Sequence, residues 1–380
     1  MLHNGYVSER LVINMRFVRV DELTKGMRLA KPIYNKNGVL LYDRDTKLTK
    51  QGINSIKNFK LIGMYILEPA EPLPPMTQDD IDFERFQTMS VFGLKEALES
   101  IMDGRKPANI MTLIKTLIKK YAKRSNKVNF VQNLRSCDDY VYKHSINVAV
   151  LAALMGARLR ISVEDMKNMV YAALIHDIGK LYIPPEIVEK PVHMDEDRKT
   201  VTACETKGDK YLQEMDFISD SVKLILQQKY TLQSDARIKA KDKRFKECAR
   251  ILQIAEKYDD MTAMKIGKEP CSDIIAIREL LANTEIYDEI IVAALVDSMK
   301  VLHPGVCVEF SNGNSGLVIR ANEENVLRPL VLCFNDNQVY DFAEENVAAM
   351  LKIKDIMKIM DKRIKIDQAT IDEYLRRYNS

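Results

Sequence analysis

The stretch Ala172-Ala-Leu-Ile-His-Asp-Ile-Gly-Lys180 determines how the rest of the chain is interpreted. It has the pattern of an apolar helix that ends in an adjacent histidine and aspartate, followed by a glycine and a lysine. Neighbouring helical residues point about 100° apart, but at a helix end His176 and Asp177 can converge on one ion. Imidazole and carboxylate together suit iron, manganese or zinc. Lys180 would add a flexible positive charge that can bind a phosphate.

Two other stretches offer ligands for the same ion. His144 lies early in an amphipathic helix expected over residues 142–158, and Glu256 lies on another expected over 246–260. A His-Asp pair alone is more often a buried structural pair. Helical bundles, however, build metal centres from inward-facing side chains of several helices, so the added residues favour a metal site. The expected ligands are His144, His176, Asp177 and Glu256.

The composition of the 380-residue chain is that of a globular protein with roughly two or three domains. Lys and Arg total 57 and Asp and Glu total 54, and this net charge of +3 does not by itself indicate nucleic-acid binding. No apolar run approaches the ~20 residues of a membrane helix, and the N-terminus lacks a signal-peptide core. Six cysteines without a CxxC motif predict reduced thiols and a cytoplasmic location. With five histidines in all, a histidine-rich metal site is excluded.

The hydrophobic pattern divides the chain into a small β-rich module, a proline-rich linker, a helical domain and a module with a β-hairpin and terminal helices. The predicted boundaries are 1–68, 69–82, 83–302 and 303–380. The predicted fold class is multidomain and mainly α, an all-helical bundle flanked by small β-rich modules. Residues 1–14 fit a tail and an over-extended start equally well.

Individual elements follow from periodicity and turn residues. In the first module we expect strands over 16–20, 29–34, 39–42 and 63–67, a helix over 48–59, and a hairpin turn at Asn37-Gly38. The bundle helices are expected over 110–121, 142–158, 163–175, 209–228 and 246–260. The last module should hold strands over 306–310, 316–320 and 330–334, a turn at Asn312-Gly313, and helix from about 344 to 378.

The order of the expected ligands resembles the HD superfamily of metal-dependent phosphohydrolases, and the surrounding sequence is similar to its HD-GYP subfamily. The similar stretches are YVYKHSINVAVLA, AALIHDIGKLYIPPEIVEKP and ARILQIAEKYDDMT, within residues 138–305. The resemblance implies an all-helical domain and a part in signalling by cyclic di-GMP, a bacterial second messenger that this subfamily hydrolyses. It also implies a cyclic dinucleotide or related nucleotide as partner. The residues expected to contact that partner are Lys180, Arg237 and Lys265.

Several positions depart from the pattern of that subfamily. A histidine that the subfamily carries four residues before a glycine is Cys204 here, ahead of Gly208. Its His-His-Glu triplet aligns with Gln227-Gln228-Lys229, and its Gly-Tyr-Pro loop with Asp235-Ala236-Arg237. The aspartate of the third motif is Glu256, which keeps a carboxylate. These changes imply one divalent transition metal, or none if the site is vestigial.

Three hypotheses remain open from the sequence. The first is a degenerate, weak cyclic di-GMP phosphodiesterase in which Asp177 and Lys180 are catalytic and the basic loop around Arg237 neutralises phosphates. The more common role of such a loop is a solvated, flexible surface. The second is a catalytically inactive module that binds a nucleotide or a protein partner. The third is a structural relic whose flanking modules bind partners, and a homo-oligomer is compatible with all three.

Overall fold

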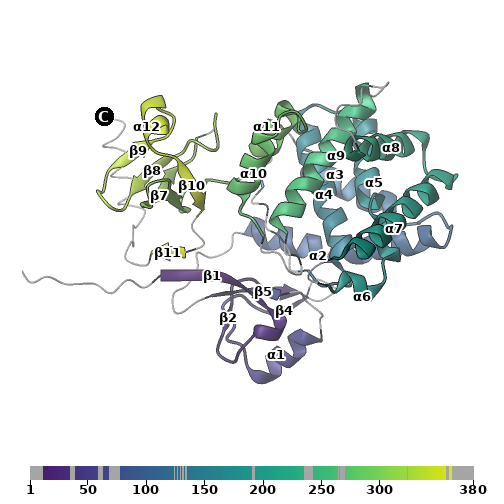
Figure 1. Cartoon of the computed structure of the whole chain (residues 1–380), viewed down its shortest axis with the longest axis horizontal. Helices are drawn as coiled ribbons and strands as arrows, with labels where there is room; N and C mark the ends of the chain where they lie inside the picture. Colours follow the sequence, from purple (N-terminus) through teal and green to yellow (C-terminus); the bar gives the residue numbers. More distant parts are fainter. Residues whose placement is uncertain are drawn as a thin grey trace, which may run out of the picture.

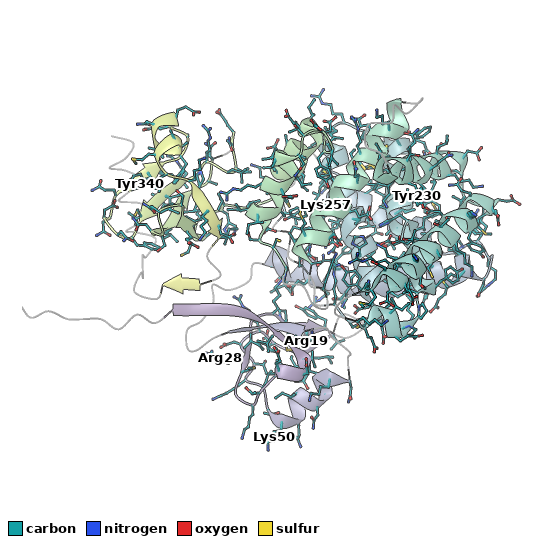
Figure 2. All side chains as sticks on the ribbon, in the orientation of Figure 1. Arg19, Arg28, Lys50, Tyr230, Lys257 and Tyr340 are labelled. Atoms are coloured by element: carbon teal, nitrogen blue, oxygen red, sulfur yellow. The ribbon has the colours of Figure 1, made fainter. Side chains whose placement is uncertain are left out.

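The computed structural model describes most of the chain. The described residues are 12–34, 39–58, 63–67, 78–123, 125, 127–128, 130, 132, 135–190, 193–234, 243–263, 265, 270–322, 324–356 and 359–361. These residues form a helical domain flanked by two small antiparallel β modules (Figure 1), which confirms the predicted fold class. Figure 2 shows their side chains, with Arg28 and Lys50 on the N-terminal module and Tyr340 on the C-terminal one.

The N-terminal module is a short twisted sheet with one helix. Its elements are β1 (Val12–Arg19), β2 (Arg28–Leu29), β3 (Ile33–Tyr34), β4 (Leu40–Tyr42), α1 (Lys50–Lys57) and β5 (Gly63–Leu67). Thr49 begins α1 by accepting a hydrogen bond from the amide of Gly52 at 3.0 Å. β3 and β4 pair antiparallel, as the predicted hairpin requires, although its Asn37-Gly38 turn lies outside the described residues.

The helical domain is built around α4, whose residues are buried without interruption from Tyr142 to Gly156. A helix that is buried on all sides must have neighbours on all sides, and α2, α3, α5, α9 and α11 pack around it. The helices are α2 (Gln78–Met102), α3 (Ile110–Tyr121), α4 (Tyr140–Arg158), α5 (Val163–Ile175), η2 (Ile178–Tyr182), α6 (Pro185–Val188), α7 (Asp195–Glu214), α8 (Asp220–Ser234), α9 (Lys243–Thr262), α10 (Asp273–Ala282) and α11 (Glu289–Asp297).

The single helix predicted over 209–228 is wrong, because two helices, α7 and α8, share this stretch. The chain turns between them, where the amide of Ile218 bonds to the carbonyl of Met215 and Ile218 is buried. The Ser219 hydroxyl then accepts a hydrogen bond from the amide of Val222 in the first turn of α8. No glycine or proline marks this break in the sequence, so the hydrophobic periodicity predicts one continuous helix across it. Helix α2 begins at Gln78, inside the segment interpreted as linker.

The C-terminal module is a five-stranded antiparallel sheet in the order β10-β6-β7-β8-β9. Its elements are β6 (Cys307–Phe310), β7 (Ser315–Arg320), β8 (Leu330–Cys333), β9 (Val339–Asp341), α12 (Glu345–Met350), β10 (Ile353–Ile356) and β11 (Ile359–Asp361). The three predicted strands and the β6–β7 hairpin are confirmed. The helix predicted over 344–378 is wrong for Ile353–Ile356, which pair with β6 as a strand, and for Ile359–Asp361, which form β11. Residues 362–380 lie outside the described part.

Strand β11 leaves the C-terminal module and pairs with β1 of the first module, giving a sheet in the order β11-β1-β5-β2 (Figure 1). The two β modules therefore share a sheet although the helical domain separates them in sequence. Among the described residues, no helix combines the length and apolarity needed to cross a bilayer.

Candidate metal centre

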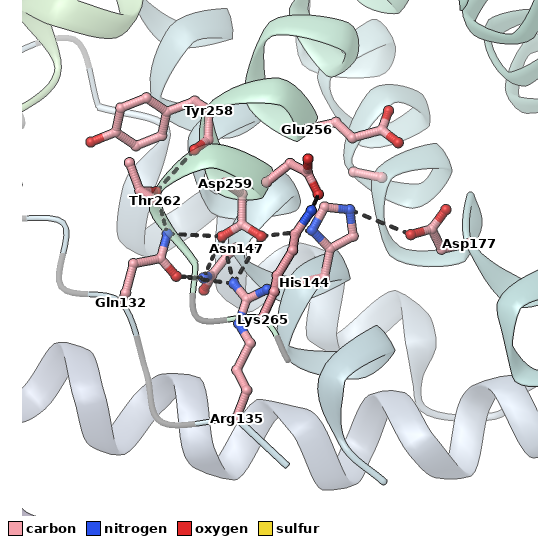
Figure 3. Close-up of polar contacts among 12 residues, drawn as sticks. Gln132, Arg135, His144, Asn147, Asp177, Glu256, Tyr258, Asp259, Thr262 and Lys265 are labelled. Carbon is pink, nitrogen blue, oxygen red and sulfur yellow. Dashed lines mark hydrogen bonds and ion pairs between the residues drawn. The ribbon is translucent and has the colours of Figure 1, made fainter. Parts of the chain in front are cut away.

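Four side chains from different elements, three of them buried and Glu256 half-buried, meet at one point in the helical domain. His144 lies on α4, Glu256 lies on α9, and His176 and Asp177 connect α5 to η2. One ligand atom of each residue lies within 4.8 Å of those of the other three. The four residues expected as ligands thus come together, and Figure 3 shows His144, Asp177 and Glu256 of this cluster.

The chain leaves the helical path just where two of these residues stand. Helix α5 ends at Ile175; His176 still has helical dihedral angles, φ −57° and ψ −28°, whereas Asp177 has φ −103° and ψ 16°. This change rotates the Asp177 side chain away from its helical direction and toward the neighbouring imidazole. The adjacent pair therefore converges at the helix end.

Two glycines let α7 approach this turn closely. A Cβ on Gly208 of α7 would lie 2.4 Å from the Cα of Gly179 in η2, and a Cβ on Gly179 would lie 2.6 Å from the carbonyl oxygen of Cys204. Because backbone atoms cannot move aside, both positions require glycine. Cys204 itself is not part of the cluster: its thiol donates to the carbonyl of Tyr182 at 3.6 Å.

Both histidines present their Nε2 nitrogen to the cluster, because their Nδ1 nitrogens are bound elsewhere. His144 Nδ1 lies 2.6 Å from Oδ2 of Asp259, and His176 Nδ1 lies 2.8 Å from the carbonyl oxygen of Ala173. Since a carboxylate and a carbonyl only accept, each Nδ1 carries the proton and donates it. Both Nε2 atoms then hold a lone pair, and both are buried without a hydrogen-bond partner in the described structure.

The spacing of the donors fits a single divalent ion. His144 Nε2 lies 3.4 Å from Asp177 Oδ2, and His176 Nε2 lies 3.5 Å from Asp177 Oδ1 and 4.0 Å from Glu256 Oε1. Two ligands at about 2.1 Å from a tetrahedral ion are about 3.4 Å apart. Two unpartnered imidazole nitrogens facing two carboxylates can therefore serve as the donor set for one divalent metal ion.

The electrostatics keep this donor set ready for a cation. Burial lowers the pKa of His176 to about 4, so its imidazole is neutral at neutral pH. Burial tends to raise the pKa of Asp177, but the neighbouring histidines and Lys180 outweigh it and hold that pKa below its ordinary value. Burial acts the same way on Glu256, where Lys229 and His176 lower the pKa. Both carboxyl groups are ionised.

Two lysines already contact the carboxylates. Lys180 Nζ lies 2.7 Å from Oδ2 of Asp177, and Lys229 Nζ lies 2.8 Å from Oε2 of Glu256. Lys229 comes from the segment of α8 that aligns with the subfamily's metal-binding triplet, whereas Gln227 of the same segment is exposed. The sequence indicated a positive charge at position 229 but not its ion pair with Glu256.

Behind His144, a buried polar network that the sequence did not reveal fixes the imidazole (Figure 3). Asp259 lies at its centre and accepts hydrogen bonds from Arg135 at 2.6 and 2.8 Å, from Asn147 at 2.8 Å and from Gln132 at 3.0 Å. A carboxylate behind a ligating histidine fixes its tautomer and orientation. Asp259 lies three residues after Glu256 on α9, and this helical spacing is the one signal that could have indicated it.

A cleft of about 770 Å³ opens beside the cluster. Two lining residues connect the cleft to the metal centre. Lys180 binds Asp177, and the Tyr140 ring stacks on the His144 ring with 6.4 Å between the ring centroids. Basic side chains also line it, together with acidic ones: Lys190, His193, Arg198, Lys265, Asp138, Glu189 and Asp260. Lys265 forms an ion pair with Asp260. Arg237, the third residue expected to contact a nucleotide, lies outside the described residues.

Comparison with known proteins places this cluster in a family. The HD domain family matches residues 109–291, which include all four residues of the cluster. The chain contains an HD domain. This HD domain is homologous to HD-GYP cyclic di-GMP phosphodiesterases, in agreement with the resemblance seen in the sequence.

Two curated proteins and one solved structure are similar to the chain that carries this HD domain. Cyclic di-GMP phosphodiesterase PA4108 of Pseudomonas aeruginosa is 23% identical over 235 residues, 60% of this chain and 56% of that protein. The 3'3'-cGAMP-specific phosphodiesterase 1 of Vibrio cholerae is 32% identical over 78 residues, 20% of this chain and 18% of that protein. Bd1817, a HDG"Y"P protein from Bdellovibrio bacteriovorus, matches with a TM-score of 0.45 and 16% identity, over 76% of this chain and 98% of that one. The chain thus spans about half the length of the first relative and less of the second.

Proposed function

We propose that this protein is a cyclic dinucleotide phosphodiesterase of low turnover that works with one divalent transition metal. The observation that carries this proposal is the pair of buried, unpartnered Nε2 atoms of His144 and His176 facing the carboxylates of Asp177 and Glu256. A divalent ion held there supplies Lewis acidity toward a phosphoryl oxygen. Cyclic di-GMP and the related 3'3'-cGAMP, the substrates named for the two curated relatives, are the first candidates.

The chain's own residues provide the rest of the chemistry. His144, His176, Asp177 and Glu256 would hold the ion. Asp259 orients His144, and the buried helices exclude bulk water from one side. Lys180 lies between Asp177 and the cleft, so its ammonium group can bind a phosphate oxygen and oppose the charge that develops on it. In the reaction, water adds across one phosphodiester P–O bond and leaves a phosphomonoester and a hydroxyl group.

A direct test is incubation of the purified protein with Mn²⁺ and either cyclic dinucleotide, followed by chromatographic detection of the linear product. We expect slow conversion that stops in His176→Ala, together with loss of bound Mn²⁺. The matched control is His303→Ala, since this histidine lies outside the cluster and contacts the carbonyl of Pro304. If no linear product forms, or if His176→Ala forms as much as the unmodified protein, the proposed hydrolysis is wrong.

A second candidate is an inactive module that binds a cyclic dinucleotide without cleaving it. The ion pairs of Lys180 with Asp177 and of Lys229 with Glu256 favour it, because the two lysines neutralise both carboxylates of the cluster without a metal. In that case a cyclic dinucleotide raises the melting temperature in the absence of Mn²⁺, and no product forms.

A further inference from the structure

Lys229 is a buried cation in the wall of the metal centre. Its side chain is 8% exposed, and its ammonium group lies 2.8 Å from Oε2 of Glu256. The other oxygen of the same carboxylate, Oε1, faces the Nε2 atom of His176 at 4.0 Å. Glu256 therefore directs one oxygen to the donor cluster and the other to a fixed positive charge.

The surroundings of this ammonium group are acidic. Glu205 and Asp209 of α7 lie close enough for the charge of Lys229 to lower the pKa of each carboxyl group, while burial has the opposite effect and raises the pKa of Asp209 to about 6. Glu205 also lies 3.9 Å from Lys180, which pairs with Asp177. Together with Asp177 and Glu256, the carboxyl groups of Glu205 and Asp209 provide more acidic groups around Lys229 than the donor cluster of one divalent ion uses.

The ammonium group on Oε2 of Glu256 opposes binding of a second divalent ion to that oxygen. Protonated lysine has donors only and cannot ligate a metal, and two cations a few ångströms apart in a buried site repel strongly. We propose that Lys229 takes the place of a second metal ion, so that the centre holds one divalent cation beside the lysine side chain. This inference rests on the metal site of the proposed function and deepens it.

The arrangement has a consequence for the ligand. A phosphate bound at this centre would meet one metal ion and a lysine, which is a point charge with movable donors. The ammonium group supplies positive charge without a vacant coordination position. It therefore favours binding of a phosphodiester over activation of a second ligand, which is what the proposed low turnover requires.

Calorimetric titration of the metal-free full-length protein with Mn²⁺ alone tests this inference. We expect the unmodified protein to bind one equivalent. In Lys229→Gln and in the more apolar Lys229→Met, removal of the ammonium group should tighten that equivalent by roughly tenfold or more. Lys229→Glu should bind a second equivalent, because it adds a carboxylate near Asp209 and Glu256. Lys223→Gln, a half-buried lysine of the same helix, is the matched control and should match the unmodified protein.

Circular dichroism of each variant verifies that it is folded. If Lys229→Gln does not fold, Lys229→Met is the second variant, because methionine keeps a buried apolar chain like the aliphatic part of the lysine. Any of four outcomes would overturn the inference. They are two Mn²⁺ equivalents in the unmodified protein, unchanged Mn²⁺ affinity in Lys229→Gln and Lys229→Met, a single equivalent in Lys229→Glu, and no Mn²⁺ binding by any of the proteins. Because no nucleotide is present, a protein inactive on cyclic dinucleotides can still pass this test. The Mn²⁺ titration therefore tests the role of Lys229 separately from the hydrolysis assay, which tests the proposed activity.

Discussion

Asp259 shows how much of the candidate site depends on a residue that does not face the cluster. It is fully buried, and its two oxygens accept hydrogen bonds from His144, Arg135, Asn147 and Gln132. A carboxylate offers about four acceptor positions, so its capacity is filled by these partners. Arg135 also lies over the ring of Tyr140 at 4.9 Å, which ties the network to the wall of the cleft.

Arg135→Met tests this network at the scale of one side chain. Removing one partner of a buried ion pair leaves the Asp259 carboxylate with an uncompensated charge, and we expect a loss of about 3–5 kcal/mol of unfolding free energy. Arg105→Met is the control, because its pair with Asp103 is exposed and should contribute less than about 1 kcal/mol. Urea denaturation of both variants measures the difference, and equal small losses would show that the network does not stabilise the fold.

The sequence predicted these residues unevenly. His144, His176, Asp177 and Glu256 were recognisable because each stands in a helical pattern or at its end, and the structure brings them together. Arg135 was not, because the segment before α4 has no periodicity, and its burial results from the fold as a whole. Whether Asp177 and Lys180 are catalytic stays a prediction.

At the scale of elements, the crossing of α7 over η2 sets the position of the Asp177–Lys180 turn. The crossing is close because Gly179 and Gly208 face each other without side chains. The sequence predicted the ends of α3 and α5 correctly, since strong periodicity and the Ser162 cap define them. It did not predict the break between α7 and α8, which burial of Ile218 rather than a glycine or proline produces.

Gly208→Ala tests the crossing. The new methyl group would overlap the backbone of Gly179, and the expected cost of such overpacking is about 1–3 kcal/mol. Because the turn carrying Asp177 must shift with η2, Mn²⁺ affinity should fall as well. Gly93→Ala is the matched control: it is also a helical glycine, but its Cβ would lie 3.9 Å from the nearest side-chain atom. That variant should be about 0.5–1 kcal/mol more stable. Similar melting temperatures and Mn²⁺ affinities in both variants would contradict the proposed role of the crossing.

At the scale of the whole molecule, both β modules are connected to the helical domain, and one of these connections leads to the metal centre. Lys31 of the N-terminal module donates a hydrogen bond to the carbonyl of Gln132 at 2.8 Å, and the side chain of Gln132 binds Asp259 behind His144. Arg278 of α10 binds carbonyl groups of β10 in the C-terminal module. The sequence predicted both modules, but pairing of β11 with β1 depends on contacts between distant segments, which periodicity does not encode.

Lys31→Met should therefore change the metal centre from a distance, while Arg278→Met should not. Loss of the hydrogen bond to Gln132 frees the segment that positions Asp259, and one such bond corresponds to about 0.5–1.5 kcal/mol, or about twofold to tenfold in Mn²⁺ affinity. Arg278→Met also removes an anchor between a module and the helical domain, so it controls for general loosening. Mn²⁺ titration of the two variants separates the cases. If both variants bind Mn²⁺ as the unmodified protein does, or if both weaken binding equally, the path from Lys31 to His144 carries no coupling.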